Sequence, residues 1–286
     1  MIDIRRELAE AVRGRVAGPG GAERASVLRD APGPRWFDDD RPIRAVHVDA
    51  AMFIGGLRAL LLQSLHPLAM AGVAGHSDFR RDPWGRLQRT ADFLAATTFG
   101  PAEEAECAVA TVRRVHARVA GTASDGRTYR ANDPHLLAWV HIAEVDSFLS
   151  SHQRFGHRPL TPEQADGYVA DMARIASELG VPDPPTTVAE LAGALHGYRH
   201  ELRTTREARE AARFLFLPPL PFVARGPYAV LSAAAVSLLP WWVRASLRLP
   251  PLTPVTDALV VRPAATALVE VLRWALHEQP DAEDAA

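Results

Sequence analysis

Three histidines stand at positions where an imidazole side chain could do chemistry. His66 precedes a proline at the end of an apolar run, while His116 and His141 occupy inward positions of two predicted helices, 101–120 and 133–152. A neutral imidazole can ligate a metal ion, and a buried imidazole needs a partner for each nitrogen. A single inward histidine is more often a hydrogen-bonded structural residue than a ligand. Three inward histidines in neighbouring helices favour a shared site about as much as three separate structural roles. Periodicity alone does not decide between these two interpretations.

Arg86 and Thr90 lie one helical turn apart, beside an apolar stripe of the predicted helix 84–98. Together they could form an anion clamp, or a polar group above a bound cofactor. The alternative interpretation is local, because an arginine at the edge of an apolar stripe can extend to solvent and a threonine can bond its own helix backbone. The segment just before this helix contains glycines and a proline, which allow backbone to approach a ligand closely.

Several common catalytic patterns are absent from the chain. It has no paired Glu-x-x-His motifs of the di-iron bundles, and no zinc-protease, serine-hydrolase, P-loop or dinucleotide-binding motif. All 32 basic residues are arginines, which excludes a lysine nucleophile or Schiff base. Cys107 is the only cysteine, so an internal disulfide is excluded, and we expect its side chain to pack in a helix. His196 and His200 lie in an arginine-rich segment and are expected on a solvated face.

Composition is that of an ordinary globular protein, because 48% of the 286 residues are hydrophobic and 23% are charged. The net charge of −2 offers no basic excess to neutralise phosphates, which argues against a nucleic-acid-binding role. The N-terminal segment lacks the apolar centre of a secretory signal. The longest nearly apolar run, 229–243, is shorter than the roughly 20 residues that span a bilayer. We therefore expect no transmembrane span and a cytoplasmic location.

Helical periodicity begins near residue 45 and continues almost to the C-terminus, which predicts an all-α fold in one domain. Residues 1–42 are expected to form a short helix and a Gly/Pro-rich arm, and residues 43–280 the helical domain. Thr161, followed by a proline and then a glutamine, predicts a capped helix start. Predicted helices cover 46–65, 68–76, 84–98, 101–120, 133–152, 161–179, 186–213, 226–247 and 260–277, and an extended piece is predicted at 127–130.

The segment 214–249 is unusually apolar and contains the pair Trp241-Trp242 beside Arg244. Three interpretations remain open for this segment. It could be a buried helix, which we favour, a patch that lies on a membrane surface, or the wall of a tunnel for an apolar substrate.

Several long motifs in this order resemble one known family. These are LHPLAMAGVAGHS, DPWGRLQRTADFLAATTFG, VRRVHARVAG and YRANDPHLLAWVHIAEVDSFL, followed by LTPEQADGYVADMARIASELGVP. Together they are similar to the rubber oxygenase (latex-clearing protein) catalytic-domain family, which also includes the fungal endoplasmic-reticulum oxygenase of mycophenolic acid biosynthesis. The resemblance covers roughly residues 43–250.

The resemblance implies a globin-like helical bundle that binds haem b and carries out O2-dependent chemistry on a hydrophobic small molecule. It places His116 as the proximal iron ligand, and Arg86 and Thr90 as the family's Arg-x-x-x-Thr near the haem. His141 matches a histidine of the following helix, with a supporting or structural role. His66 is also expected near the cofactor, where it caps carbonyl groups freed by the helix break.

Two departures from the rubber-cleaving members limit what the resemblance implies. Those members have a lysine just before the matching threonine, and this chain has Arg89 there. They also have an acidic residue upstream of the arginine, but no glutamate occurs between Arg41 and Gly100. The substrate, the redox partner and the oligomeric state are therefore not indicated. The alternative interpretation is a non-catalytic helical protein that binds haem or lipid, with contact to a membrane surface.

Overall fold

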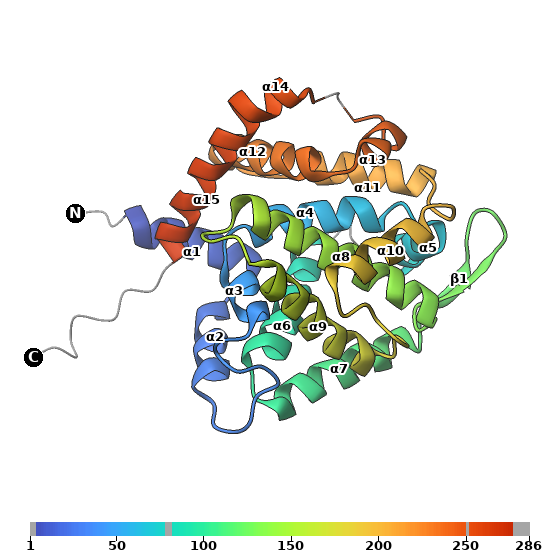
Figure 1. Cartoon of the computed structure of the whole chain (residues 1–286), viewed down its shortest axis with the longest axis horizontal. Coiled ribbons are helices and arrows are strands. Elements are labelled where there is room, and N and C mark those ends of the chain that lie inside the picture. Colours follow the sequence, from blue (N-terminus) through green and yellow to red (C-terminus); the bar gives the residue numbers. More distant parts are fainter. Residues whose placement is uncertain (1–3, 78–81, 250–251, 277–286) are drawn as a thin grey trace, which may run out of the picture.

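The computed structural model describes residues 4–77, 82–249 and 252–276, and these residues are mainly α-helical (Figure 1). Their strands, β1 and β2, form a two-stranded antiparallel hairpin. The all-α class is therefore confirmed. The elements are α1 Ile4–Val16, α2 Gly21–Asp30, α3 Pro42–Val48, α4 Met52–Gln63, α5 Pro67–His76, α6 Pro83–Phe99, α7 Ala102–His116, β1 Ala120–Thr122, β2 Thr128–Arg130, α8 Pro134–Phe155, α9 Pro162–Leu179, α10 Val188–Tyr198, α11 Arg206–Phe216, α12 Phe222–Leu238, α13 Trp241–Ser246, α14 Pro254–Thr256, the π-helical turn η1 Asp257–Val261 and α15 Arg262–Leu276.

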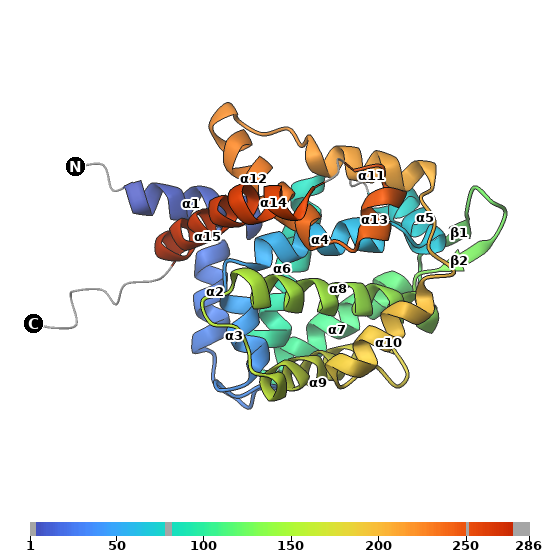
Figure 2. The same cartoon turned by 45° about the horizontal axis from the view of Figure 1, so that its top comes forward.

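Helix α8 runs through the middle of the molecule and packs most extensively against α4 (Figures 1 and 2). The close approach requires Gly55 on α4, because a Cβ there would lie 2.7 Å from Cδ1 and 3.2 Å from Cα of Phe148. Buried Arg58 of α4 also holds the two helices together. It donates to Ser147 Oγ at 2.7 Å and forms an ion pair with Asp146 at 2.6 Å. Helix α8 is thus fixed in position by both packing and charge.

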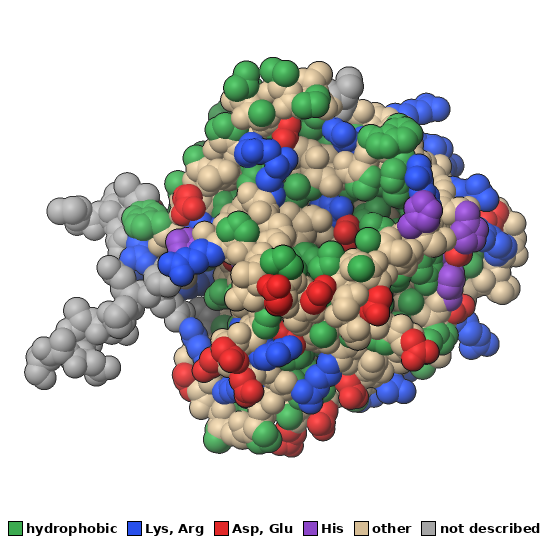
Figure 3. Space-filling model, viewed as in Figure 1, with side chains coloured by type: hydrophobic (Ala, Val, Ile, Leu, Met, Phe, Trp, Pro, Cys, Tyr) green, Lys and Arg blue, Asp and Glu red, His purple; other side chains and the backbone are tan. Residues whose placement is uncertain are grey.

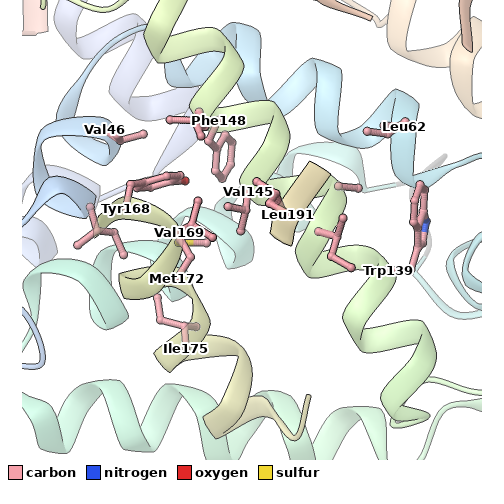
Figure 4. Close-up of a cluster of buried hydrophobic side chains, with 14 of the residues drawn as sticks. Val46, Leu62, Trp139, Val145, Phe148, Tyr168, Val169, Met172, Ile175 and Leu191 are labelled. Atoms are coloured by element: carbon pink, nitrogen blue, oxygen red, sulfur yellow. The ribbon is translucent and has the colours of Figure 1, made fainter. Parts of the chain in front are cut away.

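The main core lies between α8, α9 and their neighbours α3, α4 and α10 (Figure 4). Its largest fully buried side chains include Trp139 of α8 and Tyr168 of α9. Leu191 of α10 closes the core from the other side. The side chains in Figure 4 come from helices far apart in the sequence, so the apolar faces predicted separately meet in one place.

Helices α6 and α7 are in contact and are joined at Gly100 and Pro101 (Figure 1). The β1–β2 hairpin then connects α7 to α8, and the Ala131 amide donates to the Val119 carbonyl at 2.9 Å. This bond brings the end of α7 and the start of α8 together. The extended segment predicted at 127–130 is confirmed as β2.

Side-chain caps explain where several helices begin. The capping box predicted at Thr161 is present, since Thr161 Oγ1 accepts from the Gln164 amide and Gln164 Oε1 accepts from the Thr161 amide. Asp133 likewise caps α8 by accepting from the His135 amide at 2.9 Å.

Two predicted helices are divided in the structure, and the predicted Gly/Pro-rich arm contains a helix. The helix predicted at 46–65 is divided into α3 and α4, with a bend of 94° between them. At the break, Asp49 accepts from the Ala51 amide at 2.8 Å and pairs with Arg273 of α15 at 3.0 Å. The helix predicted at 186–213 ends at Tyr198 and restarts at a second cap, Thr205. The N-terminal arm contains α2, which packs against α6.

The C-terminal helices differ from the buried helix that we favoured. The end of α12 is buried, as Ala234 and Ala235 have no exposed surface, but Phe222 at its start is 84% exposed and Trp241 of α13 is 70% exposed. Only part of this apolar segment is therefore core.

Cys107 is exposed on α7, so its predicted packing role was wrong. Its position early in α7, away from the buried side chains of that helix, explains the difference.

Among the described residues, no single helix has the length and apolar character to cross a membrane. The pair α3 and α4 passes that test only when its two strongly bent halves are taken together.

Candidate functional site

Arg86 lies near the start of α6, and His116 is the last residue of α7, the helix that follows the turn at Gly100 and Pro101. Arg86 is half-buried and its Nη1 donates to Ser77 Oγ at 3.1 Å. Burial, together with the charge of Arg89, lowers the pKa of the Arg86 guanidinium.

Thr90 adopts the local arrangement that the sequence left open. Its side chain is exposed, and its Oγ1 donates to the Arg86 carbonyl one turn earlier at 3.1 Å. In the described residues no hydrogen bond joins the side chains of Thr90 and Arg86. The structure therefore places the two residues side by side without showing a shared ligand-binding contact.

His116 is the last residue of α7 and is half-buried. Burial lowers the pKa of its imidazole, so the ring is mainly neutral at neutral pH. No hydrogen bond to this ring is present within the described part of the chain. A neutral imidazole of this kind has a free nitrogen lone pair, which is the state that ligates a metal.

His141 is the histidine with the most unusual surroundings. It is buried on α8, burial lowers its pKa to about 4, and its Nε2 has no hydrogen-bond partner among the described residues. An unpartnered buried polar atom costs free energy, so this nitrogen is a candidate contact for a bound group or a water molecule.

His47 gives the matched contrast to His141. Burial lowers the pKa of His47 to about 3, with the nearby His152 adding to the shift. Its Nδ1 lies 2.8 Å from Thr98 Oγ1 and its Nε2 lies 3.4 Å from Tyr168 Oη. Because both ring nitrogens have partners, His47 is a structural histidine.

Glu144 follows His141 by one helical turn, on the same side of α8. Burial raises the pKa of its carboxyl to about 7, yet the side chain keeps some accessible surface. The carboxyl is thus deep enough to lose most of its solvation without being fully packed by protein. Sequence analysis did not identify Glu144 as a functional residue. The signal was present, since an acidic residue lies among apolar residues on the inward face of this helix.

His66 is separate from the residues above. It caps α5 by accepting from the Ala69 amide at Nδ1 (3.4 Å), while its Nε2 lies 3.3 Å from Glu201 Oε2. The expectation that it caps carbonyl groups was wrong, because a helix that begins at Pro67 leaves amides rather than carbonyls without partners.

The partners of His66 were not identified from the sequence either. His135 in the first turn of α8 places its Nε2 2.9 Å from both carboxylate oxygens of Glu201. No local pattern could have found this contact, because Glu201 follows α10 and lies far along the chain from both histidines.

The largest surface hollow among those identified lies elsewhere, between α8, α9, α10 and the loop after α9. Its volume is about 810 Å³, and Tyr198 of α10 and Arg174 of α9 contribute to its wall. Figure 3 shows this face of the molecule, with histidine side chains gathered on the side where α10 lies. Neither Arg86 nor His116 lines this hollow.

Comparison with known proteins identifies one family. The family described as ER-bound oxygenase mpaB/B'/Rubber oxygenase, catalytic domain, matches residues 44–274. This range contains Arg86, His116 and the inward face of α8. No curated protein and no solved structure matches the chain.

Proposed function

Because the chain belongs to the ER-bound oxygenase mpaB/B'/Rubber oxygenase catalytic-domain family, we propose that it is a haem b-dependent oxygenase of a hydrophobic small molecule. The family is an oxygenase catalytic domain. The observation that best supports a resident prosthetic group is His141, whose buried Nε2 has no partner in the described residues. A bound group that contacts this nitrogen would remove that cost.

The residues present fit a haem in their chemistry. Haem iron in proteins is commonly held by a neutral histidine. His116 and His141 are both neutral at neutral pH because burial lowers their pKa values. They lie on α7 and α8, the two helices that meet at the β1–β2 hairpin. In this proposal His116 would hold the iron, and His141 would support the bound group through its Nε2.

Arg86 supplies the cation of the proposed site. Its half-buried guanidinium could pair with a propionate carboxylate and would give up its bond to Ser77. Thr90, one turn further along α6, would have to change its side-chain rotamer to take part. Its contribution is therefore the smaller of the two.

Bound haem would supply the iron chemistry that activates O2. The chain itself would supply binding, orientation and proton control. Glu144 has a pKa of about 7, so its carboxyl can hold or release a proton near neutral pH. Half-buried Phe93 and Leu94 of α6 pack against the main core.

One observation favours the second candidate, a lipid-binding protein at a membrane surface. Leu217, Phe222, Val223 and Trp241 are each at least 70% exposed around α12 and α13. Large exposed apolar side chains of this kind mark interaction surfaces. This function would use a different part of the molecule from the proposed haem site.

A visible spectrum of protein purified from haem-supplied cells tests the proposal. A Soret band, followed by oxygen consumption with unsaturated apolar compounds, is the expected result. A colourless protein that consumes no oxygen, yet binds lipid vesicles through Phe222 and Trp241, would favour the second candidate. The variants Phe222→Ser and Trp241→Ser should then abolish vesicle binding.

A further inference from the structure

His66, His135 and Glu201 form a compact cluster outside the proposed haem site. His66 caps α5, His135 lies in the first turn of α8, and Glu201 follows α10. One ligand-type atom from each residue lies within 4.8 Å of the other two. Two imidazoles and one carboxylate form a ligand set found in both zinc and non-haem iron proteins.

We propose that this cluster binds one first-row divalent metal ion, Zn²⁺ or Fe²⁺. The ligand spacing carries the proposal. With metal–ligand bonds of about 2.0–2.2 Å, neighbouring ligand atoms around a tetrahedral or octahedral centre lie about 2.8–3.6 Å apart. His66 Nε2 lies 3.3 Å from Glu201 Oε2, and His135 Nε2 lies 2.9 Å from Glu201 Oε1. Both contacts to Glu201 thus already have the spacing of neighbouring ligands in a coordination shell, and the ligand atoms of the two histidines lie within 4.8 Å of each other.

Tyr198 orients the His135 ring as a supporting residue does at a metal site. Its hydroxyl donates to the His135 carbonyl at 2.8 Å, and its oxygen lies 3.2 Å from His135 Nδ1. Since the hydroxyl proton is committed to the carbonyl, Nδ1 donates to the tyrosine oxygen. A cation, either a proton or a metal ion, is then needed between His135 Nε2 and the Glu201 carboxylate that it faces. Donation from the distal ring nitrogen is the usual arrangement for histidine ligands.

The protonation states of His66 and Glu201 also suit a metal. Burial lowers the pKa of His66 despite the opposing effect of Glu201, so its ring is largely neutral at neutral pH. Burial alone would raise the pKa of Glu201, but the hydrogen bonds from His135 and His66 lower it overall. One cost remains, because binding through His66 Nε2 puts the proton on Nδ1 and breaks the long bond from the Ala69 amide.

The backbone around the cluster is held in place without a metal. The Arg203 amide donates to the Leu65 carbonyl at 2.8 Å, which fixes the segment after α10 beside the start of α5. The side chain of His135 is 53% exposed, so solvent and ions reach the cluster. Three protein ligands leave at least one coordination position open. Tyr198 also lines the hollow of about 810 Å³, and a small molecule in that hollow would lie next to the residue that orients His135.

The test is direct metal binding by the full chain, freed of metal with a chelator. Titration with Zn²⁺ should show one ion bound per chain, and Co²⁺ should give a visible absorption band from a histidine and carboxylate site. The melting temperature should rise with added Zn²⁺, because the ion binds the folded chain. These readouts do not depend on haem or oxygenase activity, so the metal site and the proposed function can fail separately.

Variants separate this site from adventitious binding. His135→Ala and Glu201→Gln should each weaken Zn²⁺ binding at least tenfold, and Tyr198→Phe should weaken it less, as loss of a supporting residue does. His196→Ala is the matched control, because His196 is exposed on α10 outside the cluster and should leave binding unchanged. Circular dichroism checks that each variant is folded. The proposal is overturned if the wild-type chain binds no stoichiometric Zn²⁺, or if folded Glu201→Gln and Tyr198→Phe both bind it as tightly as wild type.

Discussion

Helix α8 holds histidines in two contrasting surroundings. In its first turn, His135 bonds to Glu201 and Tyr198, and Glu201 also accepts from His66. Two turns further along, His141 is buried with an unpartnered Nε2 in the described residues. Glu144, on the same side as His141, has a raised pKa caused by burial alone.

The difference lies in how each region meets the cost of removing polar groups from water. In the cluster at the start of α8, the groups satisfy one another, so a small cation would only replace bonds that already exist. On the inward face, His141 is neutral at neutral pH and its Nε2 is unsatisfied among the described residues, which costs about 1–3 kcal/mol for such a group. The first region therefore fits the proposed metal ion, and the second fits the proposed haem.

The largest effect is expected from His116→Ala. If His116 is the axial ligand, this variant should lose nearly all bound haem while its far-ultraviolet circular dichroism stays close to wild type. His141→Ala should lose only part of the haem, as changes to supporting residues usually do. Absorbance at the Soret band per mole of protein is the measurement, and His200→Ala, an exposed histidine, is the control. Full occupancy in His116→Ala, with loss only in His141→Ala, would transfer the ligand role to His141.

Glu144 should make stability depend on pH. Its pKa is about 7 in the folded chain and 4.5 when unperturbed, so the folded state binds the extra proton. Stability from this group is therefore complete below about pH 4.5 and is lost as pH rises through 7, by about 2–3 kcal/mol.

Urea unfolding of wild type and Glu144→Gln at pH 5 and pH 8 measures this effect. The variant should gain free energy of unfolding relative to wild type at pH 8, but not at pH 5. Glu103→Gln on exposed α7 surface is the control. An equal difference at both pH values would mean that Glu144 does not titrate in this range.

His141 and His47 should respond oppositely to an apolar replacement. His141→Leu removes an unsatisfied nitrogen and should stabilise the haem-free protein by about 1 kcal/mol. His47→Leu leaves Thr98 and Tyr168 without partners and should destabilise it by about 1–3 kcal/mol. Chemical denaturation of the two variants side by side makes the comparison. Destabilisation of similar size in both would show that the His141 nitrogen is satisfied in solution.

The smallest effects are expected on α6. Arg86→Lys keeps the charge but loses the planar guanidinium, and Thr90→Ala removes a hydroxyl that now bonds its own helix. Each should lower haem content modestly, with Arg86→Lys the larger, and the double variant should lose less than the sum. Haem content and oxygen uptake equal to wild type in both single variants would leave Arg86 as an edge residue and place the cofactor elsewhere.

Local signals in the sequence determined much of the fold. Apolar periodicity located most of the helices, and the pattern at Thr161 predicted a capping box that is present. The turn at Gly100 and Pro101 and the extended piece at 127–130 were also visible. These features depend on residues that are neighbours in the sequence, so they can be predicted without the tertiary structure. The family assignment likewise follows from long ordered motifs, which the match to residues 44–274 confirms.

Tertiary structure decided the rest, because those features depend on partners distant in the chain. At the break between α3 and α4, Arg273 of the last helix pairs with Asp49. Periodicity predicted an inward His141, but only the folded chain shows that its Nε2 has no partner among the described residues while both nitrogens of His47 have one. Glu201 meets His66 and His135 only after α5, α8 and α10 have packed. A ligand set of this kind forms because its residues are close in the folded chain, and the spacing of those residues in the sequence does not predict it.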